Sequence, residues 1–160
     1  MQLGEAFVGD GANAAHVNTV LGRRDGPVGT AWATALATPT TGHAPFVVVL
    51  QPGVPVRPFT LFVNKAGIES DDHARLTWGA AQAGVAAGVA DAAADNVIAD
   101  LDDVLIAAVW VNPAADDAAA VFANNRDATR RALAMGAIGG PDPASIQQAR
   151  ANPSNPFFSG

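Results

Sequence analysis

Two segments near the start of the chain alternate apolar and polar residues on either side of a glycine-rich turn. Residues 2–8 and about 14–21 are predicted to be strands, and the turn between them runs from Gly9 through Asp10 to Gly11. Side chains of a strand point alternately to its two faces, so this pattern fixes which residues of the second strand can reach a core. The rest of the fold must supply that core.

One face of the second strand carries polar groups that can do chemistry. Val17, Thr19 and Leu21 can face a core, which leaves His16 and Asn18 side by side on the opposite face. Histidine is the side chain whose ordinary pKa lies nearest neutral pH, so His16 is a candidate proton donor or acceptor. The alternative is that His16 is a satisfied structural histidine, since most histidines do no chemistry.

The remaining pattern mixes strands and helices without strict alternation, which indicates a single α+β domain in which helices pack on a mixed sheet. Further strands are predicted at residues 46–50, 59–65 and 103–111. Helices are predicted at about 25–37, at 70–96 with an interruption near Gly79, and at 116–135. The prolines of residues 51–58 exclude that segment from the middle of a sheet. From about residue 139 we expect an extended tail.

Composition excludes several classes of function. The 160 residues suit one domain, and 49% of them are hydrophobic, many being alanine. Without cysteine the chain has no disulfide, thiolate zinc site or cysteine nucleophile. A net charge of −6 with 9 Lys and Arg residues argues against nucleic acid as a partner. No secretory signal and no membrane span is evident, so we expect a cytoplasmic protein that binds no membrane.

Familiar catalytic motifs are absent from the sequence. There is no dinucleotide or phosphate-binding glycine loop, no HExxH and no GxSxG, and the three histidines lie far apart. We therefore expect no metal site. On residue chemistry alone the candidate site groups are His16, Asn18, Asp10, Lys65 and Gln82.

Two amides interrupt the apolar stripes of predicted helices. Gln82 lies on a stripe with Val85 and Val89, and Asn125 lies on a stripe of the last long helix. Buried amides need partners, so each either bonds nearby backbone or borders a polar cleft.

An ordered series of motifs resembles the formaldehyde-activating enzyme family, and the likeness covers nearly the whole chain. The motifs, in order, are GEAFVGDG with His16 five residues later, GPVGTA at 26–31, GHAP at 42–45, FVVVLQPGVPVRP at 46–58, TLFVNK at 60–65, GAAQAGVAAGVADA at 79–92, LDDVLIAAVWV at 101–111, NNRDATRRA at 124–132 and NPF at 155–157.

The resemblance implies a fold, an activity and an assembly. Members condense formaldehyde with tetrahydromethanopterin to give methylene-tetrahydromethanopterin and water, which makes them lyases of one-carbon metabolism and formaldehyde detoxification that need no metal or redox cofactor. They are homopentamers, their fold is like the second domain of a small-subunit ribosomal protein, and the pterin binds between neighbouring subunits.

The resemblance also assigns roles to individual residues. His16 matches the family's proton donor, and Lys65 and Gln82 match its substrate-binding lysine and glutamine. Val47 stands where the family has a pterin-contacting leucine. Asn18 and Gly67 occupy the substrate-binding positions where the family has an aspartate and a threonine. These two departures motivate a second hypothesis, a non-catalytic or retargeted protein that binds a pterin, a folate or formaldehyde.

Overall fold

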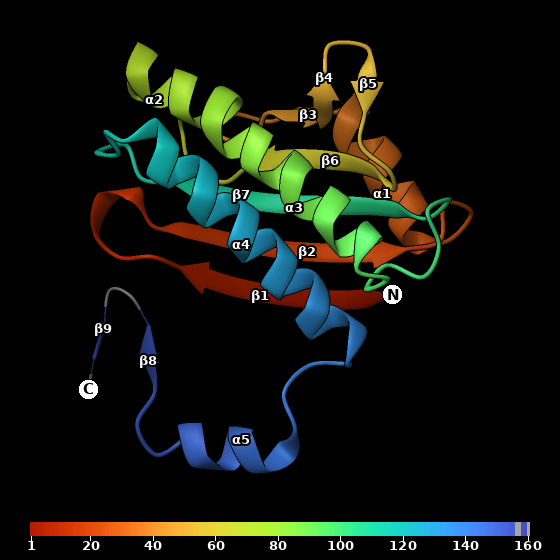
Figure 1. Ribbon diagram of the computed structural model, residues 1–160, viewed down its shortest axis with the longest axis vertical. Helices are drawn as coiled ribbons and strands as arrows, with labels where there is room; N and C mark the ends of the chain where they lie inside the picture. The colour runs from red at the N-terminus through yellow and green to blue at the C-terminus, as the bar shows by residue number, and fades with distance from the viewer. Residues whose placement is uncertain (156–157, 160) are drawn as a thin grey trace.

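The computed structural model describes residues 1–155 and 158–159, and its centre is a five-stranded sheet (Figure 1). The strands lie in the order β1-β2-β7-β6-β3, with β6 and β7 parallel and the other neighbours antiparallel. Their bounds are β1 (Gln2–Val8), β2 (Ala15–Gly22), β3 (Pro45–Val47), β6 (Phe59–Asn64) and β7 (Val104–Val111). This arrangement confirms the α+β prediction.

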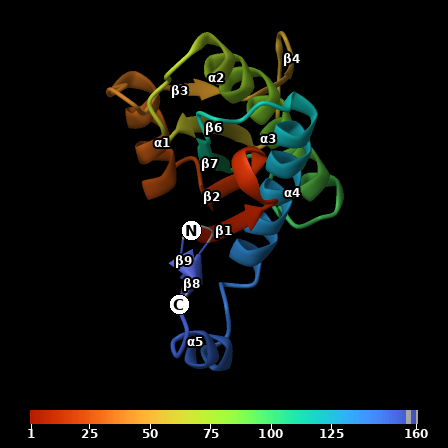
Figure 2. The ribbon, with the colours of Figure 1, turned by 90° about the vertical axis from the view of Figure 1, so that its left-hand side faces the viewer.

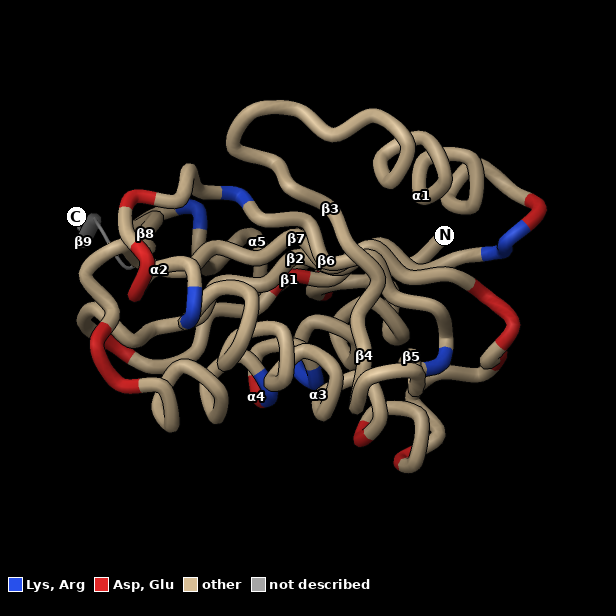
Figure 3. The backbone as a smooth tube through the Cα atoms, turned by 90° about the horizontal axis from the view of Figure 1, so that it is seen from above, with Lys and Arg blue, Asp and Glu red and all other residues tan. Residues whose placement is uncertain are grey.

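Helices cover the two faces of the sheet unequally. Helix α1 (Pro27–Ala37) lies on one side, while α3 (Gln82–Ala94) and α4 (Ala118–Ala137) lie together on the other (Figures 2 and 3). The main core lies beneath α3 and α4, and it includes Val17 of β2, Val85 of α3 and Val121 of α4, each at most 1% exposed. The single helix α1 covers only part of its side, so this face of β2 stays partly open.

Three helices begin at residues whose types suit the start of a helix. Ser70 accepts a hydrogen bond from the backbone N–H of His73 and so caps α2 (Asp71–Arg75). Asp117 caps α4 in the same way, through the N–H groups of Ala119 and Ala120. Pro27 occupies the first turn of α1, where its missing N–H costs no hydrogen bond.

At the predicted interruption near Gly79, the helix changes from α-helical to π-helical hydrogen bonding and does not break. Between α2 and α3 the chain forms η2 (Leu76–Ala81), a π-helical segment, so the helix continues from Asp71 to Ala94 without a break. It ends before Asn96, whose φ of 58° lies in the left-handed region.

The prediction of one buried strand over residues 46–50 is wrong. The segment splits at the fully buried Val48 into β3 and β4 (Val49–Gln51), and Leu50 is 47% exposed. After Val48 the chain leaves β6 and pairs with β5 (Val54–Pro55), turning through Gly53 at φ 81°. The hydrophobic run therefore serves two different sheets.

The C-terminal segment is not extended throughout, contrary to the prediction. It forms α5 (Pro143–Ala149), which begins because Asp142 caps it and Pro143 fits a first turn. All seven residues of α5 are exposed, and the helix projects away from the sheet (Figure 1). Strands β8 (Ser154–Asn155) and β9 (Phe158–Ser159) pair beyond it, while Pro156 and Phe157 of the closing NPF motif lie outside the described residues.

The last short element is the 3₁₀ turn η1 (Gly11–Asn13), which joins β1 to β2 at the predicted glycine turn. Within the described residues, no helix is both long enough and apolar enough to span a bilayer.

Glycines set the distance between the helical layer and its neighbours. A methyl group on Gly88 of α3 would lie 2.6 Å from the carbonyl oxygen of Arg126 on α4. A methyl group on Gly4 of β1 would overlap the carbonyl oxygen of Ala132 on α4. Close packing of backbone against backbone therefore positions α4 on both α3 and β1.

We predict that Gly88→Ala lowers the free energy of unfolding by roughly 1–3 kcal/mol, because the added methyl group forces α3 and α4 apart. Urea denaturation followed by circular dichroism measures this effect. The control is Gly79→Ala, since no atom lies within 4 Å of the position of its added methyl group. Equal stability of the two variants would contradict the role of Gly88 in helix packing.

Candidate active site

Three adjacent strands form a pocket on the partly open face of the sheet. It has a volume of about 310 Å³, and its lining consists of His16, Asn18, Lys65, Ala108 and Trp110. His16 pairs with Trp110 across the β2–β7 ladder, and Asn18 pairs with Ala108. Lys65 follows the end of β6, where its backbone N–H donates to Val109 of β7 over 2.9 Å. The pairing of strands thus gathers residues that are up to 94 positions apart.

The alternation predicted for β2 explains why His16 and Asn18 face this pocket. Ala15, Val17 and Thr19 are buried toward the helical layer, whereas His16 and Asn18 are half-buried on the opposite face. The side chain of His16 is 38% exposed. A reactant in the pocket can therefore reach the imidazole.

Three of the predicted site residues line this pocket, and four do not. Val47 lies on β3, separated from β2 by two strands, and Gln82 begins α3 on the other side of the sheet. Gly67 lies in the loop after β6, and Asp10 lies in the turn after β1. Substrate binding by Val47, Gly67 and Gln82 stays a prediction.

Each of the two amides forms a hydrogen bond to the backbone. The Oε1 atom of Gln82 accepts a hydrogen bond from the backbone N–H of Val49 over 2.7 Å, which ties α3 to β4. The Nδ2 atom of Asn125 donates to the carbonyl oxygen of Val121 over 2.8 Å. Gln82 therefore joins two elements of the fold, whereas the buried Oδ1 atom of Asn125 has no hydrogen-bond partner among the residues that the structure describes.

Sequence reasoning missed two residues beside His16. The Oε1 atom of Glu5 on β1 lies 3.0 Å from the Nε2 atom of His16. Trp110 forms one wall of the pocket. The signal for Glu5 was its position on the first predicted strand, but it becomes informative only when the register of β1 against β2 is known.

The other two histidines lie outside the pocket. His73 is 1% exposed; its Nε2 atom lies 3.1 Å from the carbonyl oxygen of Val111, and its Nδ1 atom accepts from the N–H of Glu69 over 3.3 Å. His43 is exposed between α1 and β3. Among the residues that the structure describes, no three His, Asp or Glu side chains converge as metal ligands.

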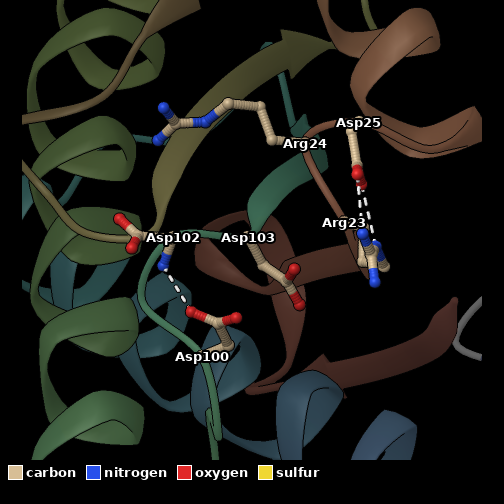
Figure 4. A pocket seen from close by; sticks show the side chains of 6 residues that line it. All are labelled: Arg23, Arg24, Asp25, Asp100, Asp102 and Asp103. Atoms are coloured by element: carbon tan, nitrogen blue, oxygen red, sulfur yellow. Dashed lines mark hydrogen bonds and ion pairs between the residues drawn. The ribbon is translucent and has the colours of Figure 1, made fainter.

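A larger, charged pocket of about 600 Å³ lies where β2 ends and β7 begins (Figure 4). Arg23 binds Asp25 at 2.6 Å, and this bond holds the pKa of Asp25 below its usual value. Burial, with the charge of Asp100 second, raises the pKa of Asp103. Arg23 and Asp25 pair with each other in this pocket, whereas the pocket at His16 contains a histidine, the residue type most suited to proton transfer, so we place the candidate active site at His16.

Comparison with known proteins tests the resemblance. The sequence model of the family described as "Formaldehyde-activating enzyme (Fae)" matches residues 3–158. The chain belongs to the formaldehyde-activating enzyme family. The match spans nearly the whole chain, including every element of the main sheet.

Named relatives of this family member fall into two kinds. A 5,6,7,8-tetrahydromethanopterin hydro-lyase of Methanosarcina barkeri is 37% identical over 97% of this chain and 89% of its own length. Bifunctional Fae/Hps enzymes of Methanosphaera stadtmanae and Methanococcoides burtonii are each 38% identical, over 82% and 89% of this chain. The matched region is 33% and 37% of those two longer proteins, so the chain spans about a third of their length.

We predict that Gln82→Leu lowers the free energy of unfolding by about 1–3 kcal/mol, because it leaves the part-buried N–H of Val49 without its acceptor. Urea denaturation measures the change. Gln147→Leu on the exposed helix α5 is the matched control and is expected to stay within about 0.5 kcal/mol of the parent. A Gln82 variant as stable as the control would show that this bond does not contribute.

Proposed function

We propose that this protein condenses formaldehyde with tetrahydromethanopterin to form methylene-tetrahydromethanopterin and water. The observation that carries the proposal is the pocket of His16, Asn18 and Lys65 in a member of the formaldehyde-activating enzyme family. The proposal follows the name of the Methanosarcina barkeri relative, which aligns with 97% of the chain.

The reaction needs a proton donor more than it needs a cofactor. A pterin nitrogen forms a bond to the carbon of formaldehyde while the C=O π bond breaks, and the proton of that nitrogen passes to the oxygen to give a carbinolamine. The C–O bond then breaks, the hydroxyl leaves as water with a proton from a general acid, and the nitrogen lone pair completes an iminium ion. The second nitrogen adds to that ion and returns a proton. A general acid at the C–O cleavage typically contributes ~10²–10⁴-fold.

His16 fits the role of this acid by position and by chemistry. It lies in the wall of a pocket, and histidine is a residue type that can both give a proton and take one back. The pocket volume of about 310 Å³ is at the lower end of the range for ligand sites, which suits the reacting rings better than a whole cofactor. Holding both nitrogens beside formaldehyde adds an orientation effect.

Lys65 and Asn18 are proposed to bind the pterin. Lys65 is exposed at the pocket, where its ammonium group can pair with a carbonyl or an anionic group of the ligand. Asn18 offers an amide with both a donor and an acceptor. We assign no Schiff base to Lys65, because the reaction described above closes without one.

The proposed assembly is a homopentamer in which each site lies between neighbouring subunits. The partial openness of the sheet face at His16 supports this view, and so do the positions of Val47, Gly67 and Gln82 outside the pocket of a single copy. In the assembly, a neighbour would supply those contacts. The likeness to a ribosomal protein domain and the cytoplasmic location stay predictions from the sequence.

We predict that His16→Ala lowers the enzymatic rate by ~10²–10⁴-fold, because it removes the general acid. The assay follows condensation of formaldehyde with tetrahydromethanopterin, after subtraction of the uncatalysed rate, and uses tetrahydrofolate in parallel. His43→Ala is the matched control and is expected to keep the parent rate, since His43 does not line the pocket. Parent activity in the His16 variant would refute its assignment.

A second candidate function is ligand binding without turnover, which Asn18 favours because an amide cannot act as a base. Under this alternative the parent protein binds tetrahydromethanopterin but does not accelerate condensation, and Asn18→Asp gains turnover. Calorimetry and the same rate assay measure the two properties. Asn152→Asp in the exposed C-terminal segment controls for added charge. Acceleration by the parent protein would exclude this candidate.

A further inference from the structure

The contact between β1 and His16 assigns a part of the site that the pocket lining does not include. Glu5 on β1 pairs with Asn18 of β2, and Phe7 pairs directly with His16. Glu5 and Phe7 are two residues apart on one strand, so both lie on the His16 face of the sheet. The Glu5 carboxylate reaches across diagonally, and its Oε1 atom lies 3.0 Å from the Nε2 atom of His16.

The imidazole ring is held between neighbours on both adjacent strands. The centre of the Phe7 ring lies 5.9 Å from that of His16, with the ring planes inclined by 48°. On the other side, Trp110 is the directly paired residue of β7. Within the described residues, the Glu5 carboxylate lies at ion-pair distance from His16, and Lys65 is the other charged residue at this pocket.

The partner of Nε2 determines which nitrogen can react. An ionised carboxylate only accepts hydrogen bonds, so the proton of this contact resides on Nε2. The neutral imidazole is then the Nε2–H tautomer, and the nitrogen that gains or loses a proton is Nδ1.

We propose that Glu5 is the positioning residue for His16: it retains the proton on Nε2 and thereby makes Nδ1 the atom that donates to the departing hydroxyl. This inference rests on the proposed function. In the acid step the Nδ1–H proton passes to the hydroxyl, which leaves as water while the nitrogen lone pair forms the iminium bond. When the ring closes, the second pterin nitrogen returns its proton to Nδ1.

A carboxylate in this place has a second effect on catalysis. It holds the ring in one orientation, so the acid does not have to be aligned when the C–O bond breaks. The side chain of His16 is 38% exposed and lines the pocket, whereas the Glu5 carboxylate, with its side chain 61% exposed, is not part of that lining. It therefore acts through His16 and does not need to touch the substrate.

Kinetics of three variants test this role. Glu5→Gln is expected to lower kcat ~10-fold or more with little change in KM, because only part of the ~10²–10⁴-fold contribution of a general acid depends on its alignment. Glu5→Asp is expected to recover part of that loss, since it restores an acceptor. Glu69→Gln makes the same chemical change on an exposed residue outside the pocket and is expected to match the parent.

A direct reading of the tautomer makes the test independent of turnover. Nitrogen-15 NMR of the labelled parent protein, above the pH at which the ring loses its charge, is expected to show His16 with the proton on Nε2. Glu5→Gln is expected to show both tautomers, because an amide can face the ring with either its oxygen or its nitrogen. Thermal melting of each variant shows whether it remains folded.

The outcomes separate the two proposals. Parent-like kcat in Glu5→Gln, or an Nδ1–H tautomer in the parent, overturns the role of Glu5 while the condensation activity stands. A parent protein that does not accelerate condensation overturns the proposed function, and the NMR result then decides by itself whether Glu5 controls the His16 proton.

Discussion

The hydrogen-bonded ladder that joins β2 to β1 and β7 is the constraint on which the rest of the structure depends. Because β2 is paired on both edges, each of its side chains must face one side of the sheet or the other. One side is sealed by α3 and α4, and the other is only partly covered by α1 (Figure 2). His16 and Asn18 are among the residues that this alternation places on the second side. The packing of the core on one side thus leaves the side chains of His16 and Asn18 accessible to a ligand on the other side.

Local patterns predicted most of the elements, because alternation, capping residues and proline placement act over a few residues. They failed where distant partners decide the outcome. The run 46–50 is equally hydrophobic on both sides of Val48, so only its pairing with β6 and β5 shows where the strand divides. Helix α5 was missed because it buries no residue and so shows no apolar stripe. Its capping residue Asp142 alone is weak evidence for a helix of only seven residues.

In the candidate site too, local sequence patterns placed some residues, whereas the pairing of distant strands placed the others. Alternation placed His16 and Asn18 on one face, while their meeting with Lys65 depends on the parallel pairing of β6 with β7, which no local pattern reveals. Lys65 and Gln82 were candidates by residue chemistry, and the family resemblance added their substrate-binding roles; of the two, Lys65 lines the pocket. Glu5 was missed because the register of β1 against β2 is a property of the folded hairpin. A glutamate on a predicted strand does not indicate a site until the residue paired beside it is known.

Gly4 connects the packing of α4 on β1 to the position of Glu5 beside the pocket. It lies against the backbone of α4 at Ala132, and the next residue along β1 is Glu5, which faces the opposite side of the sheet. A strand cannot lift from a helix at one residue without carrying the next residue with it. Because Gly4 has no side chain, β1 packs directly on the backbone of α4. The position of α4 therefore determines where the Glu5 carboxylate lies. A substitution on α4 that displaces β1 would therefore lengthen the contact between Glu5 and His16.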